Sequence, residues 1–313
     1  APLPEGQARA LRRTYENAGY GADTVELVEA HGTATKAGDA AEFAGLEIAF
    51  GESGRTDRQW CALGSVKSQI GHTKSAAGAA GLFKAVMALH HKVLPPTIKV
   101  DRPNPALNIE KSPFYLNTQA RPWIRDASHP RRASVSSFGF GGSNFHVALE
   151  EYTGPAPRAW RVRTEPTELV LLSDETAQGL SAKCDDAAKR AADSGLTAVA
   201  RASQEGFVAG AKARLAVVAS DAADLAAKLK QVQAHLAAKP DATLSTPTGI
   251  HYGVGGEAGG VAFVFPGQGS QYVGMGGDVA MSVDVARSAW DDAANARFDG
   301  STGRWTIRAG DGR

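Results

Sequence analysis

The chain has 313 residues, 43% of them hydrophobic, and its 34 Lys and Arg against 33 Asp and Glu leave a net charge of +1. This balance gives no general attraction to nucleic acid or to anionic membranes, and no apolar run reaches the roughly 20 residues of a membrane helix. The two cysteines, Cys61 and Cys184, make no disulfide framework. We therefore expect about two globular domains in a reducing, cytoplasmic compartment, without a signal peptide.

Helix and strand patterns alternate over the first 91 residues. Gly19 follows an amphipathic stretch and is typical of a helix C-cap. Asp39 with Glu42 three residues later resembles a capping box at the start of a helix. The predicted elements are helices over 4–18, from 39 to about 50 and over 74–91, and strands over 25–30 and 61–66. The last helix should present Leu82, Val86 and Leu89 on one face, and Gly78 and Gly81 should allow it to pack closely.

Residues 93–130 are irregular and rich in proline, and two β-like runs, 133–138 and 144–151, then flank a glycine turn. Alternation of helices and strands followed by a β-pair indicates an α/β layered domain. Pro, Gly and Arg residues between 153 and 166 indicate a boundary. Two strand–helix units follow: a strand over 169–172 with a helix capped by Ser173-Asp174, and a strand over 215–219 with a helix capped by Ser220-Asp221.

A loop over 239–260 should then lead to a buried strand over 261–265. The predicted organisation is therefore a first domain over 1–152, a small α/β linker module over 153–259 and the start of another α/β domain over 260–313. Beyond the two strand–helix units we find no convincing internal repeat.

Three short segments with reactive or turn-forming residues follow predicted strands. They are His31-Gly32-Thr33-Ala34-Thr35, Lys67-Ser68-Gln69-Ile70-Gly71-His72 and Phe138-Gly139-Phe140-Gly141-Gly142-Ser143-Asn144. Taken singly, such a histidine is most often structural, such a lysine a solvated charge and such glycines turn residues. Together they are specific, because the ends of strands in α/β sheets are where active sites are assembled.

These three segments resemble, in order, the three C-terminal motifs of the β-ketoacyl synthases, and the resemblance covers about residues 1–152. It implies a thiolase-like layered fold, of which this is the C-terminal half, and decarboxylative Claisen condensation of acyl and malonyl thioesters on acyl carrier protein. The parent would be a modular or iterative polyketide synthase or polyunsaturated fatty-acid synthase.

Residue roles follow from that resemblance, position by position. His31 and His72 match the two catalytic histidines, which hold the malonyl thioester carbonyl and assist decarboxylation. Lys67 matches the motif lysine, a cation that orders water and carboxylates near the histidines. Thr33 and Thr35 match residues that line the tunnel of the phosphopantetheine arm. This arm belongs to the carrier protein, so the chain should bind no cofactor or metal of its own.

The third motif supplies a gate and a turn. Phe140 matches a gating phenylalanine whose N–H helps to form the oxyanion hole, while Gly141 and Gly142 shape the turn and Asn144 ties it together. Position 34 is Ala where the family often has Gly.

The nucleophilic cysteine of the family lies before the first histidine motif, and no Cys precedes His31. Cys61 falls in a predicted buried strand and Cys184 in the linker module, so neither is expected to be reactive. The chain by itself should therefore not catalyse condensation.

Phe265-Pro266-Gly267-Gln268-Gly269-Ser270-Gln271 matches neither a dinucleotide fingerprint nor a P-loop. It resembles the opening of an α/β-hydrolase-like acyltransferase, in which Gln268 would supply an oxyanion N–H.

Three alternatives stay open: a non-catalytic scaffold or dimerisation piece, a thiolase-type acyltransferase, which would need a further Cys at the last glycine motif, and a metal site from His31, His72 and His146, whose spacing matches no common zinc pattern. The resemblance implies acyl carrier protein, acyl and malonyl thioesters and the remaining synthase domains as partners, with homodimerisation of the intact protein.

Overall fold

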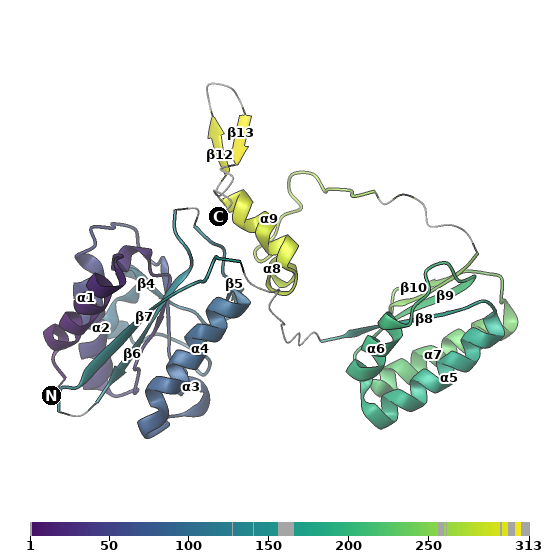
Figure 1. Cartoon of the computed structure of the whole chain (residues 1–313), viewed down its shortest axis with the longest axis horizontal. Helices are drawn as coiled ribbons and strands as arrows, with labels where there is room; N and C mark the ends of the chain where they lie inside the picture. The colour runs from purple at the N-terminus through teal and green to yellow at the C-terminus, as the bar shows by residue number, and fades with distance from the viewer. Residues whose placement is uncertain are drawn as a thin grey trace. The chain divides into compact units, whose positions relative to one another are not determined.

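The computed structural model describes residues 2–126, 128–139, 141–155, 166–255, 260, 262–294, 296–299 and 304–307. The chain forms two compact units, one made of residues 1–161 and 269–313 and the other of residues 162–268 (Figure 1). Both units are mixed α/β structures, as the sequence predicts. In the described residues no helix is long and apolar enough to cross a membrane.

A five-stranded sheet in the order β4-β2-β1-β6-β7 organises the first unit. Its strands are β1 (Leu27–Glu29), β2 (Cys61–Gly64), β4 (Phe114–Leu116), β6 (Arg132–Phe138) and β7 (Asn144–Glu150). β1 is parallel to both β2 and β6, so the chain leaves β1 and β2 at the same edge of the sheet. The predicted β-pair is confirmed, since β6 and β7 are antiparallel. The predicted strands over 25–30 and 61–66 end earlier in the structure, at Glu29 and Gly64.

Helices α1 (Pro4–Ala18) and α2 (Lys36–Gly51) cover one face of this sheet. α1 has its predicted bounds and ends at Gly19, whose φ is 74°. α2 begins earlier than predicted, because Thr35 is its N-cap and accepts a hydrogen bond from the N–H of Gly38. Asp39 and Glu42 therefore lie inside the helix and do not form its capping box. Phe50 packs against Phe114 of β4 with 4.7 Å between the ring centroids, in the core on this side.

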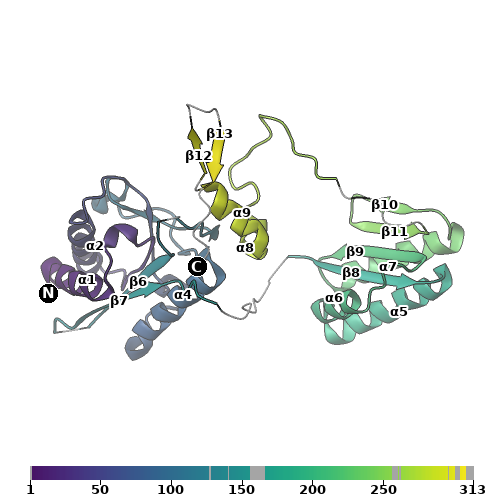
Figure 2. The same ribbon diagram turned by 45° about the horizontal axis from the view of Figure 1, so that its top comes forward.

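Helix α4 (Ala77–His91) covers the opposite face (Figures 1 and 2). Its buried residues are Ala77, Gly81, Ala85, Ala88 and Leu89. A Cβ on Gly81 would lie 3.1 Å from both Cγ of Glu29 and Cγ1 of Val135, which confirms the predicted close packing. The predicted apolar face is wrong in part, because Leu82 and Val86 are exposed. The face of α4 toward the sheet is mostly alanine and glycine, with Leu89 and the side chain of Lys84 buried as well.

The loops between these elements contain short helices and strands. A single turn of helix, α3 (Lys67–Ile70), follows β2, and the antiparallel pair β3 (Val93–Leu94) and β5 (Arg121–Pro122) lies within the proline-rich region. The loops also contain 3-10 turns at Ala22–Thr24, Lys74–Ala76, Pro105–Leu107 and Ile109–Lys111.

The described residues of the second unit form a four-stranded sheet in the order β10-β11-β9-β8 and three helices. Two features differ from the prediction. Thr176, not Ser173-Asp174, caps the first helix, and the predicted loop over 239–260 contains two strands, of which β11 pairs with β9. Asp221 caps the last helix as predicted. The elements are β8 (Glu168–Asp174), α5 (Ala177–Ser194), α6 (Leu196–Glu205), β9 (Ala213–Ala219), α7 (Ala222–Ala238), β10 (Leu244–Thr246) and β11 (Ile250–Val254).

The strand predicted over 261–265 is wrong for the residues that the structure describes there, 262–265. They form no strand, and Phe263, Val264 and Phe265 are exposed. An apolar run becomes a strand only when a neighbouring strand satisfies its backbone groups. Two short helices, α8 (Gly277–Ser282) and α9 (Asp284–Ala294), and the hairpin β12 (Ala296–Asp299) with β13 (Arg304–Ile307) follow.

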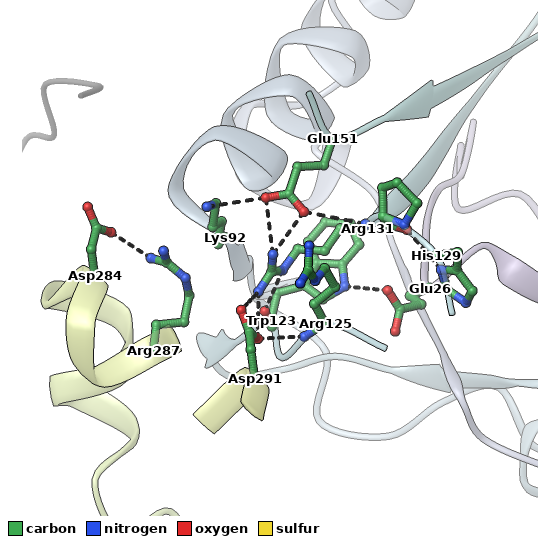
Figure 3. Close-up of polar contacts among 11 residues, drawn as sticks. Glu26, Lys92, Trp123, Arg125, His129, Arg131, Glu151, Asp284, Arg287 and Asp291 are labelled. Atoms are coloured by element: carbon green, nitrogen blue, oxygen red, sulfur yellow. Dashed lines mark hydrogen bonds and ion pairs between the residues drawn. The ribbon is translucent and has the colours of Figure 1, made fainter. Parts of the chain in front are cut away.

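Helix α9 is held to the rest of the first unit by a buried network of charges centred on Arg131 (Figure 3). The guanidinium of Arg131 donates to both oxygens of Asp291 at 2.8 and 2.7 Å and to both oxygens of Glu151 at 3.1 and 2.8 Å. Its Nε donates to the carbonyl of Trp123 at 2.6 Å. Lys92 completes the network, 3.2 Å from Glu151. Charge-assisted hydrogen bonds from one planar guanidinium to two carboxylates fix geometry as well as charge balance.

Candidate active site

His31 lies in the loop after β1, and the buried carboxylate of Glu42 holds this loop. One Glu42 oxygen accepts the N–H of His31 at 2.7 Å and the other accepts the N–H of Gly32 at 2.8 Å. Gly32 has a φ of 49°, and a Cβ there would lie 2.8 Å from Cβ of Ser65. Glycine is therefore required at this position, where the loops after β1 and β2 meet.

His72 lies in the loop after α3, next to Gly71, whose φ is 74°. The backbone N–H of Lys74 donates to Nδ1 of His72 at 3.0 Å. Since a backbone N–H can only donate, Nδ1 must be the acceptor, and the neutral ring has its proton on Nε2.

The two histidines lie next to each other, with 5.5 Å between ring centroids and 85° between ring planes. Nδ1 of His31 accepts the N–H of Phe138, at the end of β6, at 3.3 Å. By the same argument the neutral ring of His31 also has its proton on Nε2. The structure thus brings the first two motifs together as a pair of imidazoles, each with an N–H donor on Nε2.

Burial, and then the charge of Lys67, lower the pKa of His31 to about 4. His31 is therefore neutral at pH 7. The pKa of Lys67 is itself lowered by burial, which the carboxylates of Glu29 and Glu42 oppose. The lysine is thus placed between carboxylates and a histidine, close enough to act on each of them electrostatically.

Thr33 and Thr35 lie on the turn between His31 and α2. Their hydroxyl oxygens are 3.2 Å apart, and Thr35 also caps α2. Between them Ala34 has a φ of 60°, and its N–H donates to Asp39 at 3.1 Å. This left-handed backbone explains why glycine suits position 34, since a Cβ is strained there.

The turn after β6 has two left-handed glycines, Gly141 and Gly142, with φ of 84° and 89°. The N–H of Gly139 donates to the carbonyl of Ser143 at 2.8 Å and closes the turn. Asn144 begins β7, where a Cβ on Gly6 of α1 would approach its Nδ2 to 3.4 Å. Phe140 lies outside the described residues, and Gln268 is an exposed residue of the second unit.

Both cysteines are buried, which confirms the prediction for Cys61. Burial raises the pKa of the Cys61 thiol far above its ordinary value, and it raises that of Cys184 to about 12. Neither is a thiolate at neutral pH.

The described residues include no group of three or more His, Cys, Asp or Glu side chains placed to hold a metal ion. Both ring nitrogens of His146 are hydrogen-bonded, Nδ1 to Ser136 at 3.0 Å and Nε2 to Tyr15 at 3.1 Å.

The sequence motifs did not identify the carboxylates beneath the histidines. Glu42 was interpreted only as a capping residue, and Glu29 was not singled out. A usable signal was present for Glu29, because a carboxylate in an otherwise apolar, fully buried strand is rarely left without a partner.

Two family profiles match the chain: that of the β-ketoacyl synthase C-terminal domain over residues 1–101, and that of the ketoacyl-synthetase C-terminal extension over residues 103–218. A polyunsaturated fatty acid synthase polypeptide of Thraustochytrium sp. is 38% identical over 96% of this chain, and the erythronolide synthase EryA3 of Saccharopolyspora erythraea is 37% identical over 95% of it. The chain spans only 12% and 9% of those two proteins.

Among solved structures, the ketosynthase from module 6 of the bacillaene synthase of Bacillus subtilis 168 is 35% identical, with a TM-score of 0.47. This match covers 75% of this chain and 40% of that one. The profile matches and the synthase relatives agree with each other. The chain therefore belongs to the β-ketoacyl synthase family and contains that family's C-terminal domain and C-terminal extension.

Proposed function

We propose that His31 and His72 form the enolate-binding half of a decarboxylating ketosynthase site. The observation that supports this best is the pair of Nε2–H donors described above, in rings 5.5 Å apart. Two neutral donors in neighbouring rings suit an oxygen on which negative charge develops, because such donors need no reorganisation during the reaction.

In the proposed reaction the two Nε2–H groups donate to the carbonyl oxygen of a malonyl thioester. The bond to the malonyl carboxylate breaks, carbon dioxide leaves, and the electron pair forms an enolate on that carbonyl. The enolate carbon then attacks an acyl thioester held on a cysteine and expels the cysteine thiolate. Since Cys61 and Cys184 are buried thiols, we assign that cysteine to a part of the synthase outside these 313 residues.

Lys67 would keep this site cationic without itself donating a proton. Burial is the larger cause of the lowered pKa of His31, and the charge of Lys67 lowers it further, so the imidazole stays a neutral donor rather than an acid. Lys67 would also attract the malonyl carboxylate toward the histidines before carbon dioxide leaves.

The carrier protein would bring its substrate on a phosphopantetheine arm past the hydroxyls of Thr33 and Thr35, which could bond the amides of the arm. Phe140 would gate this entrance, and the turn of Gly141, Gly142 and Asn144 would shape it. The names of the polyketide and fatty acid synthase relatives support carrier-bound thioesters as substrates.

We propose three parts for the chain: the C-terminal part of the ketosynthase over 1–152, a linker over 153–259, and the start of an acyltransferase over 260–313 with Gln268 in its oxyanion hole. The parent would be a cytoplasmic homodimer that works with acyl carrier protein and with the other domains of the synthase. The reduced, buried cysteines are in keeping with this compartment.

A malonyl-carrier-protein decarboxylation assay tests the proposal. It compares this chain with a polypeptide that contains it within a complete ketosynthase domain, each with His72→Ala and with the control His251→Ala in the second unit. We expect the complete domain to release carbon dioxide, His72→Ala to abolish release, and His251→Ala to have no effect. A folded complete domain without activity would instead favour a scaffold function.

A further inference from the structure

A buried ion pair lies beneath the two histidine loops. Glu29 ends β1, and its side chain is 2% exposed. Lys84 of α4 has a side chain that is 9% exposed, and its Nζ is 2.8 Å from Oε2 of Glu29. Taking both charges out of water costs several kcal/mol per ion in general, so a pair of this kind calls for an explanation beyond stability.

The second oxygen of Glu29 is directed to the other motif. Its Oε1 accepts the backbone N–H of Val66 at 2.5 Å. Val66 is the residue immediately before Lys67, and Glu29 lies two residues before His31. One carboxylate therefore joins the ends of β1 and β2, which lead to the two histidines, and anchors both to α4.

Space for this pair is provided by two glycines. A Cβ on Gly81 of α4 would lie 3.1 Å from Cγ of Glu29. A Cβ on Gly64 of β2 would lie 3.5 Å from Nζ of Lys84 and 2.2 Å from Oγ1 of Thr97. Side chains at either position would push the pair or its neighbours aside, so the backbone around it is shaped to its size.

We infer that Glu29 and Lys84 are positioning residues, which hold the loops of His31 and Lys67 in the arrangement that brings the His31 and His72 rings together. The inference rests on the proposed function, which gives the paired rings their role in decarboxylation. Neither residue is placed to touch the substrate, and both act through the backbone. The position of His72 beside His31 is thus fixed indirectly, because Glu29 holds Val66 and Val66 connects β2 to α3, after which His72 follows.

A purely structural ion pair would affect stability alone, so the test must observe the histidines themselves. We would record ¹⁵N spectra of the imidazoles in this chain at pH 7 and the nuclear Overhauser contact between the His31 and His72 rings. The variants are Glu29→Gln, Lys84→Met and the double variant, which replaces two charges by uncharged side chains of similar size and is expected to fold. Glu151→Gln, at another buried ion pair of the same unit, is the matched control.

We expect the double variant to lose the contact between the rings or the uniform Nε2–H form of His31, while Glu151→Gln retains both even where it lowers the melting temperature. A folded double variant with the same imidazole spectra and the same contact as the unsubstituted chain would overturn the inference.

The kinetic test uses the complete ketosynthase domain. The double variant should lower kcat for decarboxylation at least about tenfold, with KM changed less than about threefold, because a small misplacement of groups slows the chemical step. An unchanged kcat would contradict the inference. If the unsubstituted domain releases no carbon dioxide, the proposed function fails, and the imidazole spectra still decide whether Glu29 and Lys84 position the histidines.

Discussion

The backbone N–H of Phe138 donates to Nδ1 of His31 at 3.3 Å, so the end of β6 fixes the tautomer of a histidine that follows β1. This contact makes His31 a donor through Nε2, and burial together with Lys67 lowers its pKa to about 4. We expect a neutral, Nε2-protonated ring in ¹⁵N spectra at pH 7. Lys67→Met should raise the pKa of His31 but leave it below 6.5, since burial is the larger cause.

Lys36→Met, on the exposed start of α2, is the control for this titration and should leave the pKa of His31 unchanged. Equal shifts in the two variants would show that general charge, and not the position of Lys67, sets this pKa.

Glu42 should make stability fall as the pH rises toward neutrality. Burial raises its pKa to about 7, which the N–H groups of Gly32 and His31 oppose. Because the folded pKa exceeds the unfolded value, near 4.5, the contribution is fully present below pH 4.5 and is lost as the pH rises through 7. The loss should be roughly 3 kcal/mol in the free energy of unfolding, measured by urea titration.

The difference between the unsubstituted chain and Glu42→Gln isolates this effect from His31 and His146, whose lowered pKa values act on stability with the opposite sign. Glu16→Gln, at an exposed carboxylate of α1, should keep the decline. A pH profile of Glu42→Gln parallel to that of the unsubstituted chain would disprove the assignment.

Ala34→Gly should stabilise the chain by up to about 1 kcal/mol, because the left-handed φ of 60° strains an alanine and not a glycine. Ala85→Gly in the middle of α4 is the matched substitution in a helical backbone and should destabilise by about 1 kcal/mol or more. Thermal unfolding followed by circular dichroism compares the two, and a loss of stability in both would argue against strain at position 34.

Glu150, the last residue of β7, and its neighbour Glu151 provide a test of the Arg131 network. Glu151→Gln should cost about 3 kcal/mol or more, since it leaves Arg131 and Lys92 short of a buried anion. Glu150→Gln, whose side chain is 43% exposed and paired with Arg132, should cost less than about 1 kcal/mol. Urea unfolding of the two variants gives the comparison, and similar costs would mean that the network adds nothing beyond a surface pair.

Local patterns predicted the α/β class, the bounds of α1 and the β6–β7 pair, because periodicity and glycine caps act over a few residues. The start of α2 was misplaced because Thr35 and Asp39 are both good caps, and only the hydrogen bond to Gly38 decides between them. The strand expected over 261–265 failed because apolar sequence does not supply a strand to pair with.

The motif residues His31, Lys67 and His72 were identified from sequence, yet the carboxylates that act on them were not. Glu29 and Glu42 meet the histidine loops only because β1 and β2 are parallel and α2 and α4 cover opposite faces of the sheet. Contacts between residues 37 positions apart, such as Glu29 and Val66, depend on topology and leave no local pattern.

The exposed apolar side chains of α4 also determine how the unfolding of this chain should be measured. Phe83 of α4 is 68% exposed, and Val86 on the same helix and Phe145 on β7 are exposed as well. Dyes that fluoresce on apolar surfaces should therefore bind the native protein, as they bind partly unfolded ones. A dye-based thermal-shift assay would begin with a high signal and give a shallow or inverted curve, so intrinsic tryptophan fluorescence or circular dichroism is the better probe of its unfolding.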